Sequence, residues 1–563
     1  MREDIVSDIV IDNTNDWGVT KLMKKIALFV AIMMIMGLVP FSAAASAAEE
    51  PAFWASEAAG YLKNYQLIPD ELFSDYDTPV RRDEFAAVLM GIYNEACQNY
   101  YTFPYYPDRF TDSVSSRYAA EIKKANIMGI INGTSETTFS PDSNITREDT
   151  ATLIFRLIKL MYPQEASTSD KIIADREQIS DYALASVEFC MNSGIMNGTG
   201  GDMFSPKGLL TRQEAMVLMY NICSRYKVVE NGRESAITEL MPLPRDFDKL
   251  VYDGFLYMRI RQSPCNFNNT ITSFPNHTLI RTPLDQSQQN KGEILFSHVD
   301  EISAYAVNQD NIFFCDRNLD RAVYSTDKNG KDIKLLYKLS QYTRSDFTYM
   351  HVEGEWLFVG AYGTLFKMRT DGTCLSIVYD GYGESPFHAE GKYIYLAGGL
   401  PQEEYMLSRV SITGAETELL YSNKNFDSSW SGGIFFNNKF YVAICEKGMS
   451  WATGVPLIEI DVDTKSVRQI QTFYSWARNE SIIEGDDGVY VSCVEQNRLN
   501  LKNISGGSDI SAIYRSEMGR GYTTKYGDYL YFSASEWQPT THYYYLYNIE
   551  TGAFTDIYGN PVS

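Results

Sequence analysis

The sequence is poor in the residues and motifs that build metal sites and hydrolase active sites. Only five histidines occur in 563 residues, none of them in a His-Glu-x-x-His pattern, and none of the eight cysteines forms a Cys-x-x-Cys pair. A Gly-x-Ser-x-Gly turn and a glycine-rich phosphate loop are also missing. These absences argue against a zinc site and against the common hydrolase and nucleotide-binding motifs. We expect no metal and no cofactor.

Positive charge is scarce as well. The chain has 49 lysines and arginines against 72 aspartates and glutamates, which gives a formal net charge of −23. So acidic a protein is unsuited to nucleic acid and to anionic membrane surfaces. If it binds an anionic polymer, the binding must depend on local basic grooves.

The eight cysteines leave two states open. An even number of cysteines in an exported chain can indicate disulfides. Their positions favour buried thiols, because Cys315, Cys445 and Cys493 each end an apolar run and Cys190 and Cys223 fall in helical patterns. A free cysteine in such a position behaves as a small apolar residue.

Long apolar runs are limited to one segment near the start of the chain. Two lysines precede the apolar residues 26–39, and a stretch of small residues ends at Ala47. This order is that of a cleavable secretion signal, and the run is short for a bilayer span. We expect residues 1–47 to be a signal peptide with an N-terminal extension, Met1 and Met23 being alternative starts. The cleaved protein is then expected to have no membrane attachment.

A repeated phrase occupies much of the first 230 residues. Gly-Ile-x-Asn-Gly, Phe-Ser-Pro and a Thr-Arg element follow one another from Gly129 and again from Gly194. An earlier copy keeps an Arg-Arg-Asp-Glu element. Arg82, Arg147 and Arg212 are 65 residues apart each time. A fixed period of this length indicates one supersecondary unit used three times.

Each copy has the pattern of two helices joined by a loop. An alanine-rich helix precedes each glycine turn, and a second helix follows each Thr-Arg element, as in residues 148–160 and 213–225. Thr146 and Thr211 are suited to cap the second helix, because an acidic residue follows three positions later. The glycines suit a helix end that needs a positive φ.

These elements resemble the S-layer homology module, the wall-anchoring unit of bacterial surface proteins. The resemblance covers residues 51–226 and divides the region into repeats at 48–108, 109–168 and 169–226. It implies an all-α helix-loop-helix triplet arranged as a pseudo-trimer. It also implies that the triplet binds secondary cell-wall polysaccharide, typically pyruvylated, in grooves between repeats.

The resemblance assigns residues to this binding. A pyruvate ketal carries a carboxylate, to which a guanidinium offers two parallel donors, and aromatic rings can stack on sugars. The expected polysaccharide-binding residues are Arg82, Arg147, Arg212, Trp54, Tyr118, Tyr182, Gly129, Gly133, Gly194 and Gly198. The alternative is that the arginines join neighbouring helices and the aromatic residues belong to the core.

Two segments of the first copy depart from the pattern. Residues 65–69 replace the glycine turn, and Arg81 replaces the threonine, which makes ligand binding by this copy less expected. The aromatic connector at residues 97–108 can either line a sugar groove or cover the helices.

The second half of the chain has a different period. After residues 227–245, which we interpret as a linker, an aromatic and β-branched triplet recurs seven times from Leu256 to Leu530, about 46 residues apart. That is the length of a four-stranded propeller blade. The pattern predicts an all-β seven-bladed propeller over residues 246–563. It resembles a propeller-like repeat domain of unknown function in clostridial surface proteins.

No catalytic signature stands out in this half. Inner-strand positions offer the only candidates for a site at the central channel, and these are His351, His388, Trp430, Glu480 and Tyr522. We interpret the chain as a secreted, non-catalytic surface protein of a gram-positive-type bacterium whose propeller binds an unknown ligand or partner. The alternative is a wall-tethered carbohydrate-active enzyme with paired carboxylates on one propeller face.

Overall fold

A computed structural model describes residues 50–556, apart from short gaps. The gaps are residues 105, 167–170, 235–238, 241–244, 247–248, 261–264, 268–269, 273–277, 284–292, 297–301, 317–320, 344, 382, 400–403, 450–453, 474–481, 486, 496–497, 514–522 and 538–539. The signal peptide expected over residues 1–47 lies outside the described residues.

The N-terminal part is helical and follows the 65-residue period. Each repeat pairs a short helix with a longer one, and each longer helix begins at one of the periodic arginines. The pairs are α2 (Ser56–Asn64) with α3 (Arg82–Cys97), α4 (Ala119–Ile127) with α5 (Arg147–Met161), and α6 (Leu184–Asn192) with α7 (Arg212–Tyr226). Short 3₁₀ turns η1 (Phe53–Ala55), η2 (Asp70–Leu72) and η3 (Arg176–Gln178) accompany them, and α8 (Val228–Glu234) follows.

Local hydrogen bonds explain where these helices begin. The Thr146 hydroxyl accepts from the Asp149 amide, as expected of an N-cap. In the third repeat Thr211 and Glu214 form a complete capping box. In the first repeat Arg81 stands in the threonine position, and its amide donates to the Glu84 carboxylate at 2.9 Å.

The short helices end in the same left-handed turn in all three copies. Gly129 has a φ of 76° and Gly194 a φ of 74° just past the ends of α4 and α6. Gln66 occupies the equivalent place after α2 with a φ of 56°. The first repeat therefore forms the turn without a glycine, in a conformation that L-residues with a side chain rarely adopt.

The three repeats close into a ring through backbone hydrogen bonds. The amide of Val80 donates to the carbonyl of Leu210, that of Leu210 to Ile145, and that of Ile145 back to Val80, at 2.8, 3.4 and 3.1 Å. These three residues are 65 positions apart, so the contacts are equivalent. The predicted helical pseudo-trimer is confirmed.

The C-terminal part is a propeller of seven four-stranded antiparallel units, as predicted. The six blades after the first are each built from four consecutive strands. The second to fourth blades are β8 (Ile302–Val307), β9 (Asn311–Asp316), β10 (Ala322–Asp327) and β11 (Lys334–Lys338); β12 (Phe347–Glu353), β13 (Trp356–Ala361), β14 (Thr364–Arg369) and β15 (Ser376–Asp380); and β16 (Glu384–Glu390), β17 (Tyr393–Gly399), β18 (Tyr405–Ser411) and β19 (Thr417–Asn423). The fifth to seventh blades are β20 (Phe426–Phe436), β21 (Lys439–Glu446), β22 (Val455–Asp461) and β23 (Val467–Phe473); β24 (Ile482–Gly485), β25 (Gly488–Glu495), β26 (Arg498–Asn503) and β27 (Ile510–Ile513); and β28 (Thr523–Tyr526), β29 (Tyr529–Trp537), β30 (Thr540–Asn548) and β31 (Phe554–Asp556).

The first blade has extra strands. Its four main strands are β2 (Lys249–Tyr252), β3 (Phe255–Ile260), β6 (Thr278–Pro283) and β7 (Glu293–Phe296), and β1 (Arg245–Asp246) pairs with β2. A hairpin of β4 (Cys265–Phe267) and β5 (Thr270–Thr272) reaches the last blade, where Cys265 pairs with His542 of β30. The recurrent triplet forms the second main strand of each blade. In β13 its members Trp356, Leu357 and Phe358 are fully buried.

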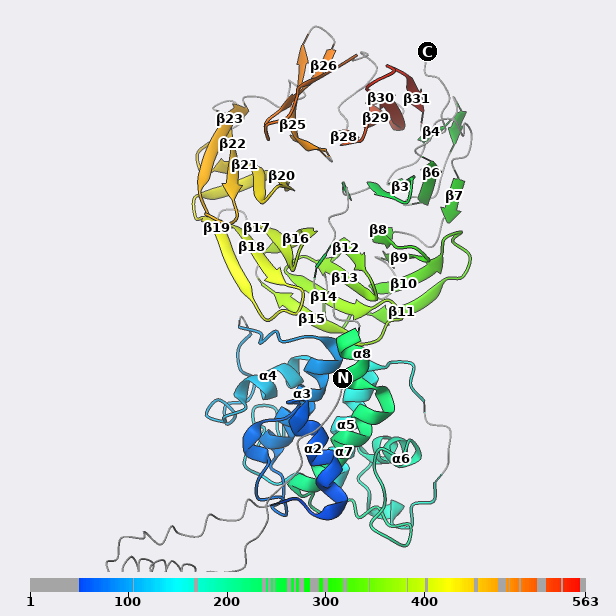
Figure 1. The fold of residues 1–563 in the computed structure, drawn as a ribbon, viewed down its shortest axis with the longest axis vertical. Helices are drawn as coiled ribbons and strands as arrows, with labels where there is room; N and C mark the ends of the chain where they lie inside the picture. The colour runs from blue at the N-terminus through cyan, green and yellow to red at the C-terminus, as the bar shows by residue number, and fades with distance from the viewer. Residues whose placement is uncertain are drawn as a thin grey trace, which may run out of the picture.

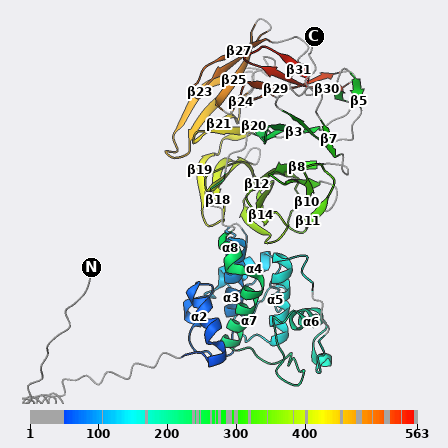
Figure 2. The same cartoon turned by 45° about the vertical axis from the view of Figure 1, so that its right-hand side comes forward.

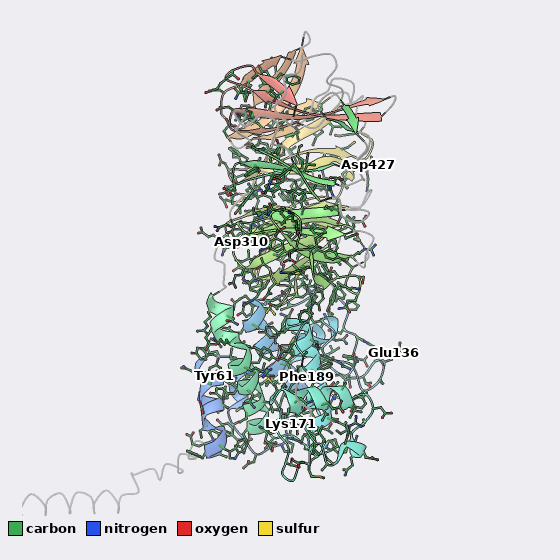
Figure 3. The ribbon with its side chains drawn as sticks, turned by 90° about the vertical axis from the view of Figure 1, so that its right-hand side faces the viewer. Tyr61, Glu136, Lys171, Phe189, Asp310 and Asp427 are labelled. Atoms are coloured by element: carbon green, nitrogen blue, oxygen red, sulfur yellow. The ribbon has the colours of Figure 1, made fainter. Side chains whose placement is uncertain are left out.

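The helical module lies against the rim of the propeller, below the blade of β12–β15 (Figures 1 and 2). One buried apolar cluster runs from helix α3 into this blade without a break. Figure 3 shows the same two-part arrangement from the side. Several hydrogen bonds join the parts, among them those that link Tyr93 to Leu375, Asn99 to Ile377, Tyr101 to Asp380, Tyr100 to Thr413, Lys367 to Gln98 and Arg369 to Asn231.

The region expected to be a linker takes part in this contact. Its first residues form α8, which packs against α3 and buries Val228 and Val229. Further along, Leu240 pairs with Gly391 of the propeller. The described residues of this segment therefore take part in the interface between the two parts, which their interpretation as a linker did not predict. The aromatic connector at residues 97–108 covers propeller strands, which neither sequence-based alternative foresaw.

Candidate functional site

The periodic arginines reach from one repeat into the next. Arg82 Nε donates to the Phe139 carbonyl at 3.0 Å, and its guanidinium carbon lies 4.8 Å from the Phe139 ring centroid. Arg147 repeats both contacts with Phe204, at 2.9 and 5.0 Å, and its Nη2 also donates to the Asn197 carbonyl. Each arginine therefore connects two repeats and lies at the junction between them, and we call each of these junctions a groove.

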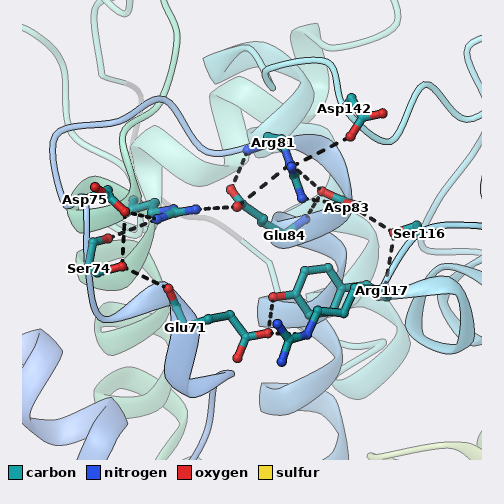
Figure 4. Close-up of polar contacts among 11 residues, drawn as sticks. Glu71, Ser74, Asp75, Arg81, Asp83, Glu84, Ser116, Arg117 and Asp142 are labelled. Atoms are coloured by element: carbon teal, nitrogen blue, oxygen red, sulfur yellow. Dashed lines mark hydrogen bonds and ion pairs between the residues drawn. The ribbon is translucent and has the colours of Figure 1, made fainter.

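The third arginine makes the same connection with ion pairs. Arg212 Nη1 donates to the Ser74 carbonyl at 3.1 Å, and Nη2 lies 2.5 Å from Glu84. Figure 4 labels the two acceptors, Ser74 and Glu84. The equivalent pair in the next groove, Arg82 with Asp149, is longer at 3.9 Å. An aspartate is one methylene shorter than the glutamate in this position, which accounts for the longer gap.

Burial sets the electrostatics of these guanidiniums. Burial lowers the pKa of Arg82, against the opposing charge of Asp149, and lowers the pKa of Arg147, against Glu214. Side-chain exposures of 11% for Arg82 and 15% for Arg212 leave a small part of each of these two side chains in contact with solvent. Arg212 Nε is buried and has no hydrogen-bond partner among the described residues. A buried unpaired donor of this kind calls for an acceptor.

The residue after each arginine also spans the groove, which the sequence analysis missed. In each case it accepts a hydrogen bond from the start of the next repeat. The pairs are Ser116 Oγ to Asp83 at 2.9 Å, Ser180 Oγ to Glu148 at 3.0 Å, and the Ala52 amide to Gln213 at 2.9 Å. The signal was present, since these acceptors share the 65-residue period.

A lysine borders the groove between the second and third repeats. Lys207 Nζ lies 2.5 Å from Glu148. Burial would raise the pKa of Glu148, but hydrogen bonds from Lys207 and Ser180 lower it overall. Glu148 is therefore held as a carboxylate beneath Lys207.

The three expected aromatic residues differ in exposure. Trp54 is 57% exposed and Tyr182 is 58% exposed, whereas Tyr118 is only 5% exposed. The Tyr182 hydroxyl donates to Asp149 at 2.7 Å, and that of Tyr118 donates to Glu71 at 2.7 Å. The Tyr118 ring consequently has little surface to offer a sugar, while Trp54 and Tyr182 have broad ones.

The expected glycines act through the backbone. Gly129 and Gly194 supply the positive φ described above. A Cβ on Gly133 would lie 2.4 Å from two carbonyl oxygens, and one on Gly198 would lie 2.7 Å from the Met203 carbonyl. Gly198 thus allows the close turn that brings the neighbouring Asn197 carbonyl to Arg147.

Two of the propeller candidates, His351 and His388, have described side chains. His351 is buried, and His388 stacks on Phe435 at a centroid distance of 4.4 Å and lies 3.4 Å from Glu390. The side chain of Trp430 lies outside the described residues, as do Glu480 and Tyr522. Within the described ranges, no cluster of three or more histidine, cysteine or acidic side chains is arranged to hold a metal ion, and no helix there is long and apolar enough to cross a membrane.

Comparison with known families identifies the helical module. The S-layer homology domain matches residues 109–151 and 173–216. Residues 109–216 therefore carry two S-layer homology domains, and the first repeat has the same helix pair and ring contacts. The match indicates a cell-surface, S-layer-associated protein, in which this module precedes an all-β propeller.

Two curated relatives share a stretch of 176 residues at 27% identity. They are an amylopullulanase of Thermoanaerobacterium thermosulfurigenes and the exoglucanase XynX of Acetivibrio thermocellus. The alignments cover 31% of this chain, but only 9% and 16% of the relatives. The chain thus spans a small part of these enzymes.

Among solved structures, the propeller domain of the Trilobed protease from Pyrococcus furiosus is similar over 56% of this chain and 98% of its own. The identity is 11% and the TM-score 0.37. A similarity this low supports no functional argument.

Proposed function

We propose that the helical module anchors the protein non-covalently to an anionic wall polysaccharide, bound in the grooves between repeats. The observation that carries the proposal is the recurrence of a largely buried arginine at all three junctions between repeats. A guanidinium in such a setting presents charged donors in a fixed plane, which suits a carboxylate such as that of a pyruvylated sugar.

The grooves are not equal in this proposal. The groove of Arg212 has the exposed Trp54 at its edge, since η1 contacts α7. The groove of Arg147 has the exposed Tyr182, which bonds to the start of the same helix. The groove of Arg82 has the buried Tyr118, and the exposed Tyr182 reaches it through Asp149. Because the ring of Tyr118 is buried and the first repeat has lost its glycine turn, we assign most of the binding to the two grooves of Arg147 and Arg212.

The test separates binding from folding, because the same arginines hold the repeats together. Arg147→Ala and Arg212→Ala are each expected to weaken binding of the exported chain to purified wall polymer about 10- to 150-fold, the effect of about 1.5–3 kcal/mol. Lysine should restore binding only in part, because it lacks the planar fork. Arg176→Ala is the control, since Arg176 is an exposed arginine paired with Glu188.

Binding is measured by titration calorimetry at a temperature where each variant is folded, as judged by circular dichroism. Unchanged affinity of the folded double variant Arg147→Ala/Arg212→Ala would refute the proposal. A lower melting temperature alone would leave the arginines with the joining role only, and would refute it as well.

The propeller is proposed to be the displayed part of the protein, available to a ligand or partner. The supporting observation is that the helical module lies at the rim of the ring, against β14 and β15, so it does not cross either face of the ring (Figure 1). A glycan and peptide array probed with the exported chain would test this. Signal only on wall polymer, lost in the double arginine variant, would count against it.

A further inference from the structure

Two cysteines from opposite sides of the module contact lie together in its core. Cys97 is the last residue of α3, and Cys374 lies in the turn between β14 and β15. Both are buried, with exposures of 0% and 1%. The Cys374 thiol donates to the Ala96 carbonyl at 3.5 Å, and its amide donates to the Met161 carbonyl at 2.7 Å.

The Cys374 sulfur therefore lies beside the peptide bond that precedes Cys97, and both thiols belong to one buried cluster. The other cysteines with described side chains, Cys190, Cys223, Cys315 and Cys445, are buried outside this contact. The residues that meet here are far apart in the chain and belong to different modules. A chance meeting of two rare residues in one buried contact would be unusual, since only eight cysteines occur in the chain.

The surroundings favour thiol chemistry. Hydrogen bonding from Cys97 lowers the pKa of the Cys374 thiol, whereas burial raises that of Cys97. The buried amine of Lys367 lies 4.0 Å from the Trp356 ring centroid and donates to the carbonyl of Gln98, the residue after Cys97. Burial lowers the pKa of Lys367 to about 7, so at neutral pH part of this amine is free to accept a proton.

We propose that Cys97 and Cys374 are a disulfide-forming pair that links the wall-binding module covalently to the propeller after export. The co-reactant is an external disulfide, either a small molecule or a disulfide-donating protein. The pair would fix the two modules to each other without any change in the chain path, because both sulfurs already lie in the contact. This goes beyond wall anchoring and does not depend on it.

The reaction is a balanced thiol–disulfide exchange. The Cys374 thiolate attacks one sulfur of the external disulfide, forms a mixed disulfide and releases the first carrier thiolate. The Cys97 thiol, losing its proton, then attacks the Cys374 sulfur and releases the second carrier thiolate. Both cysteines are oxidised, the carrier is reduced to two thiols, and the two protons pass to them. Because the pair is buried, the exchange is expected while the modules dock during folding.

Peptide mapping tests the proposal on the whole exported chain. The protein is refolded with excess glutathione disulfide, blocked with iodoacetamide in denaturant and digested with trypsin. Trypsin places Cys97 in peptide 83–109 and Cys374 in peptide 370–392, each with a single cysteine. We expect these two peptides to be linked in most molecules and to separate on reduction.

Matched variants complete the experiment. Cys97→Ser and Cys374→Ser should each abolish the linked species and its faster migration on a non-reducing gel, whereas Cys190→Ser should retain both. Full alkylation of both peptides in wild-type protein, or a link from either one to another cysteine, would overturn the proposal. The wild-type mapping decides the question even if a serine variant does not fold.

Discussion

Arg82 binds Phe139 twice, with its Nε–H on the backbone carbonyl at 3.0 Å and its guanidinium carbon 4.8 Å from the ring centroid. The same pair of contacts recurs between Arg147 and Phe204. At the junction that Arg212 makes, Ser74 occupies the position equivalent to Phe139 and Phe204, and ion pairs replace the contact with an aromatic ring. At all three junctions the arginine donates to a backbone carbonyl of the next repeat, but the other side-chain contacts of the arginine differ.

Arg147→Ala should destabilise the helical module strongly. The variant loses hydrogen bonds to two backbone carbonyls, one of them buried, and a cation–π contact. We expect the free energy of unfolding to fall by about 2–4 kcal/mol. Urea unfolding followed by circular dichroism at 222 nm, a wavelength that reports helix, measures it. Arg176→Ala should change stability by no more than about 0.5 kcal/mol, and equal losses in the two variants would contradict the joining role.

Gln66→Gly should stabilise the first repeat. Gln66 is exposed and sits at a φ of 56°, where a side chain costs about 1–2 kcal/mol. Glycine recovers that cost but loses about 0.5–1 kcal/mol of chain entropy. We expect a net gain of about 0.5–1 kcal/mol in the free energy of unfolding.

The reverse change tests the same turn. Gly129→Ala introduces a side chain at a φ of 76° with no steric neighbour, so it should cost about 1–2 kcal/mol through backbone strain alone. If the two substitutions shift stability in the same direction, the equivalence of the turns is wrong.

Tyr93→Phe should weaken the contact between the two modules. The Tyr93 hydroxyl is fully buried and donates to the Leu375 carbonyl at 3.0 Å, which the variant would leave without that donor. We expect a loss of about 1–3 kcal/mol. Tyr220→Phe removes a hydroxyl that bonds to Glu57 near the surface and should cost less than about 0.5 kcal/mol. Differential scanning calorimetry of both variants checks this, and a similar loss in each would contradict it.

Lys124 should make stability depend on pH. Its buried amine donates to Asn94 and Asn99, and burial lowers its pKa from 10.5 to about 7. Between these two values the unfolded chain holds the proton that the folded one has lost. Stability should therefore rise with pH in this window, by up to about 1.4 kcal/mol per pH unit from this group. Below pH 7 both states are protonated and the contribution is constant.

The comparison with Lys124→Met isolates that contribution. The variant lacks the amine but keeps a chain of similar length, so its gain in stability between pH 7 and pH 9 should be smaller than that of the wild type. Urea unfolding at the two pH values gives both gains. Identical gains would show that the amine does not titrate in this window.

The sequence predicted much of the fold because both halves repeat. The spacing of Arg82, Arg147 and Arg212 placed the start of each long helix, and the spacing of the aromatic triplets gave the number of blades. Tyr118 and Tyr182 occupy equivalent places in the repeat, yet one is buried and the other exposed. That difference depends on which neighbour each ring meets, and a single sequence carries no record of it.

The spacing of the repeats did not predict the contact between the helical module and the propeller. It joins residues 97–101 to residues 374–380, two short segments with no shared period and nearly 280 residues apart. Hydrophobic patterning reports which face of an element is buried, but not which distant segment buries it. Helix α8 was missed for a related reason, since seven residues are too few to show a helical period.

The circuit of backbone hydrogen bonds through Val80, Leu210 and Ile145 fixes how many copies the module can contain. In an open stack of repeats, a unit can be gained or lost at either end with little effect on the others. In this ring no repeat is terminal, because each one donates a hydrogen bond from a backbone amide to one neighbour and accepts a hydrogen bond at its carbonyl from the other. Removing one repeat of 65 residues would leave two repeats, one with a backbone amide and the other with a carbonyl that lacks its hydrogen-bond partner. Duplication of the gene segment would likewise add a copy with no place in the ring, so the three repeats of the helical module form a set whose number cannot change one at a time.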